Sequence, residues 1–254
     1  MARMRAMHPV PAVLRAQGLV KAFKGRVAVD QLDLTLAAGD RVGLLGPNGA
    51  GKTTTLLMIL GAIKPDSGTI DLAGHHLPHH RSKAMEQVGF VAGYLPLPEN
   101  LTVREALSLF AGFAGIRNPQ PSVDRAIAEF GLEELADQRN QELSSGQRTL
   151  VSIAKATLHQ PRLLVLDEPT ASLDPDIAGR VRSSLLDLHR RNNTALLVTS
   201  HNMREVEALC ERVVLMSAGR IVADGSPAEI ATQFDVDDLE GAFLKVAADL
   251  RGPR

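Results

Sequence analysis

A glycine-rich segment with the sequence GPNGAGKT, at residues 46–53, constrains the fold of this chain more than any other feature. It matches the pattern G-x-x-x-x-G-K-[ST], in which glycines allow backbone N–H groups to turn inward around phosphate oxygens. An apolar run at 41–46 predicts a buried strand before it, and residues from about 52 to 63 predict a helix that Pro65 ends. The positive end of this helix would face the same anion. A chance match is the alternative, but the strand–loop–helix context is what a nucleotide phosphate site requires.

The residue types in this loop indicate how a nucleotide would be held. Lys52 supplies a mobile positive charge for the β- and γ-phosphates, and the hydroxyl of Thr53 can bind magnesium. We therefore expect a nucleotide and Mg²⁺ as ligands, with contacts from the whole loop and from the residue after it. The expected nucleotide-binding residues of this segment are Gly46, Pro47, Asn48, Gly49, Ala50, Gly51, Lys52, Thr53 and Thr54.

Composition excludes several other classes of protein. Hydrophobic residues make up 44% of the 254 residues and charged residues 22%, which is typical of a folded globular chain rather than a disordered one. The formal net charge of −1 lacks the basic excess of a general nucleic-acid binder. Cys210 is the single cysteine, so an intramolecular disulfide is impossible and a reducing compartment is expected. No apolar run reaches the roughly 18 residues of a membrane span, and the first residues predict no secretory signal.

Short apolar runs alternate with helical patterns along the chain, which predicts an α/β protein with a mostly parallel sheet. Residues 13–36 carry alternating apolar positions and predict a β-rich segment in which Gly25 can turn the chain between strands. Thr102 and Glu105 form a capping-box pattern near the start of a mainly helical stretch at about 100–160. The remaining predicted elements are strands at 69–74, 163–167 and 194–200, a hairpin around Gly219, and a helix that starts at Ser226, Pro227 and Glu229.

Two acidic residues follow the apolar strand at 163–167. Asp167 lies where a carboxylate can hold Mg²⁺ through water, and Glu168 lies one residue further, where it can polarise a water for attack on the γ-phosphate. His201 follows the next predicted strand, and the ends of neighbouring parallel strands meet at one edge of a sheet. We therefore expect Lys52, Glu168 and His201 to carry the catalytic chemistry. The alternatives are two solvated acids at a strand end and a structural histidine.

One further motif points to a family. The sequence LSSGQ at 143–147 precedes a helix predicted to begin near Arg148. It resembles the LSGGQ signature of ABC ATPases, with Ser145 in place of the first glycine. A serine at a helix N-cap is common and is the alternative explanation of this segment taken alone. Together with the motifs above, the segment makes the chain similar to ABC ATPases over about residues 13–245.

The resemblance implies a fold and further site residues. The fold is that of a P-loop NTPase, an α/β protein with a RecA-like, mostly parallel sheet core, an antiparallel β subdomain and an α-helical subdomain. Phe23 matches the aromatic residue that stacks on adenine, although a Phe in a β-rich segment is most often part of the core. Asp174, in the Ser-Leu-Asp at 172–174, resembles the D-loop. The implied nucleotide-binding residues outside the phosphate loop are Phe23, Ser144, Ser145, Gly146, Gln147 and Asp174.

By the same resemblance, residues 13–245 form a single ABC-type ATPase domain. Its β-rich and RecA-like core covers about 13–92 and 160–225, and a helical lobe covers about 100–159. Residues 226–254 are expected to form a C-terminal helical extension. The part from 235 to 250 is acidic at first and then amphipathic, so we expect it to pack on its own domain.

The resemblance also implies a function. The chain would be the ATP-binding and ATP-hydrolysing subunit of an ABC transporter, most similar to the exporter-type subunits of drug- or antibiotic-efflux systems. Its working unit would be a head-to-tail homodimer or heterodimer, in which each ATP lies between the phosphate loop of one subunit and the signature of the other. A separate transmembrane permease would be the other partner and would hold the subunit at the cytoplasmic face of the membrane. No nucleic-acid partner is expected.

Two other functions compete with transport. The main alternative is a non-transport ABC ATPase that acts on DNA or ribosomes. The single phosphate loop argues against the translation-factor type, and Lys52 and Ser144 lie 92 positions apart, which leaves no room for a long inserted coiled coil. A nucleotide-gated binding module without turnover is disfavoured by Glu168.

Two features depart from the family pattern or lie outside it. Gly93 occupies the slot where the family usually carries the Q-loop glutamine, and Gln87 lies too early to align with it. One magnesium ligand is therefore in doubt, and we expect looser coupling between hydrolysis and the permease. Separately, residues 74–80 contain four histidines, but adjacent histidine pairs do not have the spacing of a structural zinc site.

Overall fold

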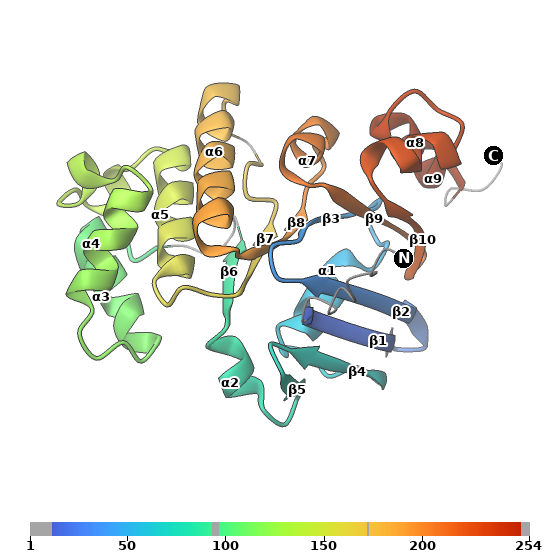
Figure 1. Ribbon diagram of the computed structural model, residues 1–254, viewed down its shortest axis with the longest axis horizontal. Helices are drawn as coiled ribbons and strands as arrows, with labels where there is room; N and C mark the ends of the chain where they lie inside the picture. Colours follow the sequence, from blue (N-terminus) through green and yellow to red (C-terminus); the bar gives the residue numbers. More distant parts are fainter. Residues whose placement is uncertain (1–11, 93–96, 172, 250–254) are drawn as a thin grey trace, which may run out of the picture.

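The computed structural model describes residues 12–92, 97–171 and 173–249; Gly93 and Ser172 lie outside these ranges. A six-stranded sheet crosses the molecule in the order β10-β9-β3-β8-β7-β6 (Figure 1). All neighbouring strands run parallel except β10, which forms an antiparallel hairpin with β9, as predicted around Gly219. The strands are β3 (Arg41–Leu45), β6 (Val88–Ala92), β7 (Leu163–Asp167), β8 (Ala195–Thr199), β9 (Arg212–Ser217) and β10 (Arg220–Gly225).

The central strands are apolar along their whole length because both faces of the sheet are covered. In β7, Leu163 and Val165 join one buried core, whereas Leu164 and Leu166 join the other. This alternation follows from the two-residue period of a strand. The sheet is therefore the middle layer, and its central strands β3, β7 and β8 are buried along nearly their whole length.

A second sheet, antiparallel and four-stranded, covers one face in the order β2-β1-β4-β5. The first two strands form an antiparallel hairpin that turns at Lys24 and Gly25, so the predicted turn at Gly25 is confirmed. In β2, Leu32, Leu34 and Leu36 are buried and the residues between them are exposed, which is the predicted alternation. The strands are β1 (Ala12–Phe23), β2 (Arg26–Ala37), β4 (Ser67–Leu72) and β5 (His75–Leu77).

Helices cover the other face and one side of the molecule. Figure 1 shows α3, α4, α5 and α6 together on the left, beyond β6 and β7, and α8 with α9 beside β9 and β10. Within the described residues, no helix combines the length and the apolar character needed to cross a bilayer. The helices are α1 (Lys52–Ile59), α2 (Arg81–Met85), α3 (Val103–Phe113), α4 (Gln120–Glu129), α5 (Ser145–Thr157), α6 (Pro175–Asn192), α7 (Met203–Leu209), α8 (Pro227–Gln233) and α9 (Leu239–Asp249), with short 3₁₀ turns at Glu133–Leu135 and Asn140–Glu142.

The local helix signals are confirmed at three places. Thr102 with Glu105, and Ser226 with Glu229, form reciprocal capping boxes at the starts of α3 and α8. The amphipathic C-terminal segment packs on its own domain, as expected, because α9 buries Leu239 among the core side chains and contacts α8, α7 and β9.

Two helix boundaries differ from the prediction. α1 ends at Ile59 rather than near Ile63, because Gly61 adopts a left-handed conformation and the N–H groups of the next two residues donate to the carbonyl of Leu57. α5 begins at Ser145 rather than near Arg148, because the Ser144 hydroxyl caps the helix from the preceding position.

Candidate functional site

The phosphate loop joins the end of β3 to the start of α1. Gly51 has φ of +104°, and a Cβ there would lie 2.4 Å from the carbonyl oxygen of Ala28, so the backbone tolerates only glycine. Lys52, the first residue of α1, folds its ammonium group back over the loop and donates to the carbonyls of Gly46 and Pro47. The loop is therefore a preformed turn whose lysine lies on its inner side.

Lys52 lies close to both acidic residues of the second predicted motif. Burial lowers the pKa of its ammonium group, and the nearby carboxylates of Glu168 and Asp167 oppose that shift. Asp167 ends β7 and is half-buried, and Glu168 follows it. The fold thus gathers a lysine from the start of α1 and two acids from the end of β7, although more than a hundred positions separate them in the sequence. The reading of the two acids as unrelated solvated residues is not supported.

His201 contacts both carboxylate oxygens of Glu168, one with its ring and the other with its backbone N–H. The ring Nε2 lies 3.1 Å from Oε1 of Glu168, and the backbone N–H of His201 donates to Oε2 at 3.3 Å. Both side chains remain accessible, with exposed fractions of 28% for Glu168 and 53% for His201. They line an open groove to which α9 contributes Phe243 and Leu244. A reactant can therefore reach the acid while the histidine fixes its orientation.

Thr199, the last residue of β8, belongs to this cluster although the sequence analysis did not single it out. Its hydroxyl donates to Oδ1 of Asp167 at 2.6 Å, and the backbone N–H of Glu168 donates to the same hydroxyl at 3.2 Å. The signal that would have found it is a polar residue at the end of an otherwise apolar strand, ALLVT, next to the strand that carries the acids.

The signature segment forms the N-terminus of α5. The Ser144 side chain accepts from the N–H of Gln147 at 3.3 Å, and the Gln147 side chain accepts from the N–H of Ser144 at 2.8 Å. Ser144 and Ser145 are exposed, while Gly146 is buried against Ile177 of α6. The N-cap explanation of Ser144 is therefore correct as a description of the helix. It leaves the exposed helix start open to a ligand.

The helix that begins with the signature and the helix that follows the phosphate loop pack against different elements. α5 packs against α3, α4, α6 and β6, whereas α1 packs against β2 (Figure 1). Ser144 and Ser145 at the start of α5 are exposed, so this helix start is accessible from outside the molecule.

Phe23 lies at the end of β1 and is not part of the core. Its side chain is 46% exposed, and the ammonium nitrogen of Lys21 lies 5.5 Å from the ring centroid. The alternative that placed Phe23 in the core is therefore wrong. An accessible aromatic face remains available for stacking.

Two expected neighbours of the site are only partly described. Asp174 is exposed and precedes α6, but its side chain makes no capping hydrogen bond. Gly93, in the expected Q-loop slot, lies outside the described residues, while Ala92 before it pairs directly with Asp167 across β6 and β7. The strand that leads into that slot therefore ends beside the acidic pair.

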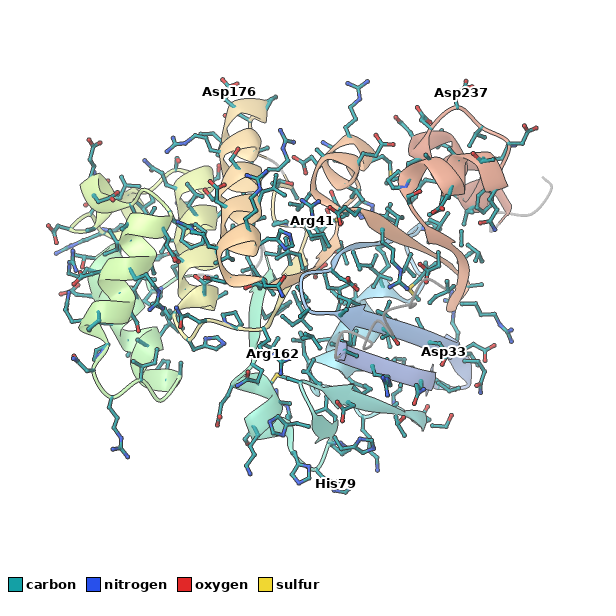
Figure 2. All side chains as sticks on the ribbon, viewed as in Figure 1. Asp33, Arg41, His79, Arg162, Asp176 and Asp237 are labelled. Carbon is teal, nitrogen blue, oxygen red and sulfur yellow. The ribbon has the colours of Figure 1, made fainter. Side chains whose placement is uncertain are left out.

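The histidines of residues 74–80 lie in and around β5, at the surface of the antiparallel sheet. Within the described ranges, no group of three or more His, Cys, Asp or Glu side chains is arranged to hold a metal ion. Figure 2 shows His79 at the outer edge of the molecule, beyond β5, and His76 lies 3.9 Å from Asp71. These side chains form a solvated surface.

Comparison with known proteins agrees with this geometry. The profile of the ABC transporter family matches residues 29–171. Nod factor export ATP-binding protein I of Burkholderia lata is 40% identical, over 87% of this chain and 73% of that protein. The lipopolysaccharide export system ATP-binding protein LptB of Haemophilus influenzae is 36% identical, over 86% of this chain and 92% of that protein. A solved structure described as the ATP-binding subunit of an ABC transporter has a TM-score of 0.82 at 26% identity, over 92% of this chain and 99% of that one.

Proposed function

Because this chain belongs to the ABC transporter ATP-binding family, we propose that it is the subunit that binds and hydrolyses ATP to drive export through a separate membrane permease. The observation that carries this proposal is the contact between Glu168 and His201 beside Lys52. It supplies a base, a group that orients it and a phosphate-binding cation at one edge of the sheet.

The phosphate loop would bind the triphosphate of ATP. The backbone N–H groups of residues 46 and 48–54, at the loop and the start of α1, favour anionic oxygens, and Lys52 would exchange its contacts with loop carbonyls for the β- and γ-phosphates. Phe23 would stack on the adenine ring, which its exposed face supports.

The hydroxyl of Thr53 and the carboxylate of Asp167 fit Mg²⁺. Both are the hard oxygen donors that this ion prefers, Thr53 is exposed, and Asp167 is half-buried beside Lys52. When bound, the ion would neutralise charge on the β- and γ-phosphate oxygens.

Glu168 would act as the general base in hydrolysis. Its carboxylate would accept a proton from a water whose oxygen bonds to the γ-phosphorus, while the bond from that phosphorus to the bridging oxygen of the β-phosphate breaks. His201 would hold the carboxylate in position through its ring and its backbone N–H. The products are ADP and inorganic phosphate.

A second ATPase subunit would complete each site. The exposed start of α5 offers N–H groups to an anion, and α5 packs against other elements than α1, the helix that follows the phosphate loop. A partner's γ-phosphate would satisfy Ser144, Ser145, Gly146 and Gln147, and Asp174 would lie at the same interface. The partner is a second copy of this chain or a related ATPase.

Export is favoured because the two curated relatives described above are named as ATP-binding proteins of export systems, one for Nod factor and one for lipopolysaccharide. We propose that the chain works at the cytoplasmic face of a membrane, attached through its permease. Action on DNA or ribosomes, the alternative, has no support among these relatives.

Affinity purification from detergent-solubilised membranes tests this proposal. A tagged Glu168→Gln chain with ATP should hold the closed dimer and recover a hydrophobic protein with several membrane spans, and purified wild-type chain should hydrolyse ATP. Glu134→Gln, an exposed acid in a 3₁₀ turn, is the matched control and should hydrolyse ATP like wild type. Recovery of ribosomes or nucleic acid alone would overturn the transport proposal, and unchanged ATPase activity in Glu168→Gln would overturn the role of Glu168.

A further inference from the structure

We propose that Thr199 is a positioning residue of this ATPase site, in which one hydroxyl holds the carboxylate of Asp167 and the backbone of Glu168 in a fixed relation. The inference rests on the proposed function, because it gives these two acids their roles. It adds a residue from β8, the strand that lies between the phosphate-loop strand β3 and the acid-bearing strand β7.

The hydroxyl of Thr199 uses both of its hydrogen-bonding abilities inside the site. It donates to Oδ1 of Asp167 at 2.6 Å, and it accepts from the N–H of Glu168 at 3.2 Å. The same N–H also donates to the backbone carbonyl of Thr199 at 3.1 Å. The parallel register pairs Asp167 directly with Thr199, so the contact follows from the sheet itself.

The hydroxyl of Thr199 is buried in an apolar strand, where it is favourable only if it has hydrogen-bond partners. Thr199 is only 1% exposed, and the four residues before it in β8 are buried and apolar. A buried hydroxyl without partners costs free energy, whereas a valine of the same shape would bury without that cost. The two acids are the partners that make this hydroxyl favourable.

The two contacts fix different features of the site. The bond to Oδ1 limits rotation of the Asp167 carboxylate, so its remaining oxygen has a defined direction. The bond from the N–H of Glu168 holds a residue whose φ is +53°, a conformation that a side chain other than glycine adopts rarely. Loss of the hydroxyl would therefore loosen the metal-binding acid and the general base together.

Three variants separate this role from a general effect on folding. Thr199→Val removes the hydroxyl and keeps the shape, and Thr199→Ser keeps the hydroxyl and removes the methyl group. Thr194→Val is the matched control, because Thr194 is also 1% exposed and its hydroxyl donates to the carbonyl of Pro161, at the opposite end of β8. If Thr199→Val does not fold, Thr199→Ala makes the same comparison.

Two measurements are made on each variant. Steady-state kinetics give kcat and KM for ATP and the Mg²⁺ concentration that half-saturates turnover. Equilibrium binding of a fluorescent ATP analogue, once with Mg²⁺ and once with EDTA, reports the site without turnover. We expect Thr199→Val to lower kcat about tenfold or more and to weaken the Mg²⁺-dependent part of binding about tenfold. Binding in EDTA should not change, and Thr199→Ser should recover most of the loss.

Three results would overturn the inference. Thr199→Val could match Thr194→Val in every measurement, Thr199→Ser could lose as much as Thr199→Val, or affinity in EDTA could fall in parallel with affinity in Mg²⁺. Each would assign Thr199 a packing role alone. A wild-type chain that neither binds nor hydrolyses ATP would instead overturn the proposed function, so the two failures are distinguishable.

Discussion

Nε2 of His201 lies 3.1 Å from Oε1 of Glu168, and the backbone N–H of His201 donates to the other oxygen of the same carboxylate. The ring and the backbone thus hold one acid at two points. Removal of the ring leaves a single contact, so the carboxylate regains a rotation that the folded site restricts.

His201→Ala is expected to lower kcat for ATP hydrolysis about 100-fold, within the range that a positioned acid–base group contributes. The KM for ATP should change little, because Lys52 and the phosphate loop are untouched. His79→Ala, an exposed histidine at the outer edge, should match wild type in the same steady-state assay. A His201→Ala chain with wild-type kcat would contradict this arrangement.

Phe23→Ala is expected to weaken ATP binding by about 1–3 kcal/mol, the value of one base stacked on an aromatic side chain. The melting temperature should not fall appreciably, because the ring is 46% exposed and buries little apolar area. Val27→Ala, which shortens a side chain with 49% exposure in the same hairpin, is the control. Titration with a fluorescent ATP analogue measures the effect, and equal affinities for the two variants would refute the stacking role.

Gly146→Ala is expected to destabilise the protein and to lower its ATPase activity. The added Cβ would lie 2.0 Å from Cγ2 of Ile177, and overpacking of this kind costs about 1–3 kcal/mol, which exceeds the gain of about 1 kcal/mol in helix propensity. Ser145→Ala changes an exposed residue one position earlier and is the control. Its free energy of unfolding should stay within about 0.5 kcal/mol of the wild-type value.

The double variant Gly146→Ala with Ile177→Ala tests the cause. Because it removes the methyl group that the new Cβ would strike, it should recover part of the lost melting temperature. No recovery would mean that the glycine is needed for another reason.

Cys210 is expected to resist alkylation in the folded protein. Burial raises the pKa of its thiol to about 12, and the thiolate is the reactive form. Against an unfolded thiol with a pKa of about 8.5, the folded chain at pH 8 has roughly a thousandfold less thiolate. Iodoacetamide labelling followed by mass spectrometry, in buffer and in urea, measures the ratio. Rapid labelling in buffer would show that the strand ends near Cys210 open frequently.

The same pKa shift predicts a dependence of stability on pH. Since the folded pKa lies above the unfolded one, the contribution is fully present below about pH 8.5 and is lost as pH rises towards 12. Between pH 8.5 and 10, wild type should therefore lose stability to urea faster than Cys210→Ala does. Parallel losses in the two chains would contradict the shift.

The sequence predicted those features that short segments determine. The phosphate loop, the capping boxes at Thr102 and Ser226 and the apolar strands depend on residues within a few positions of each other, and the structure contains each of them. The end of α1 was misplaced because Gly61 closes the helix before Pro65 can act. Local patterns therefore located the elements better than their ends.

The features that could not be predicted from the sequence depend on the register between strands that are distant in the chain. Thr199 and Asp167 are 32 positions apart, and only the parallel pairing of β7 with β8 makes them partners. Phe23 was ambiguous for a similar reason, because alternation along β1 is interrupted by register shifts and its last residues extend beyond the covered part of the sheet. A pattern within one segment contains no information about which residue will lie opposite.

The strand order has a consequence for how the chain acquires its activity during synthesis. β8 lies between β3 and β7 but is made after both of them, so the phosphate loop and the acidic pair cannot be joined until residues 195–199 have left the ribosome. Pairing between such distant segments is slow compared with local folding. A nascent chain therefore carries two unconnected half-sites from the synthesis of Glu168 until β8 is available, and ATP can stabilise the fold through both halves only after β8 has been inserted into the sheet.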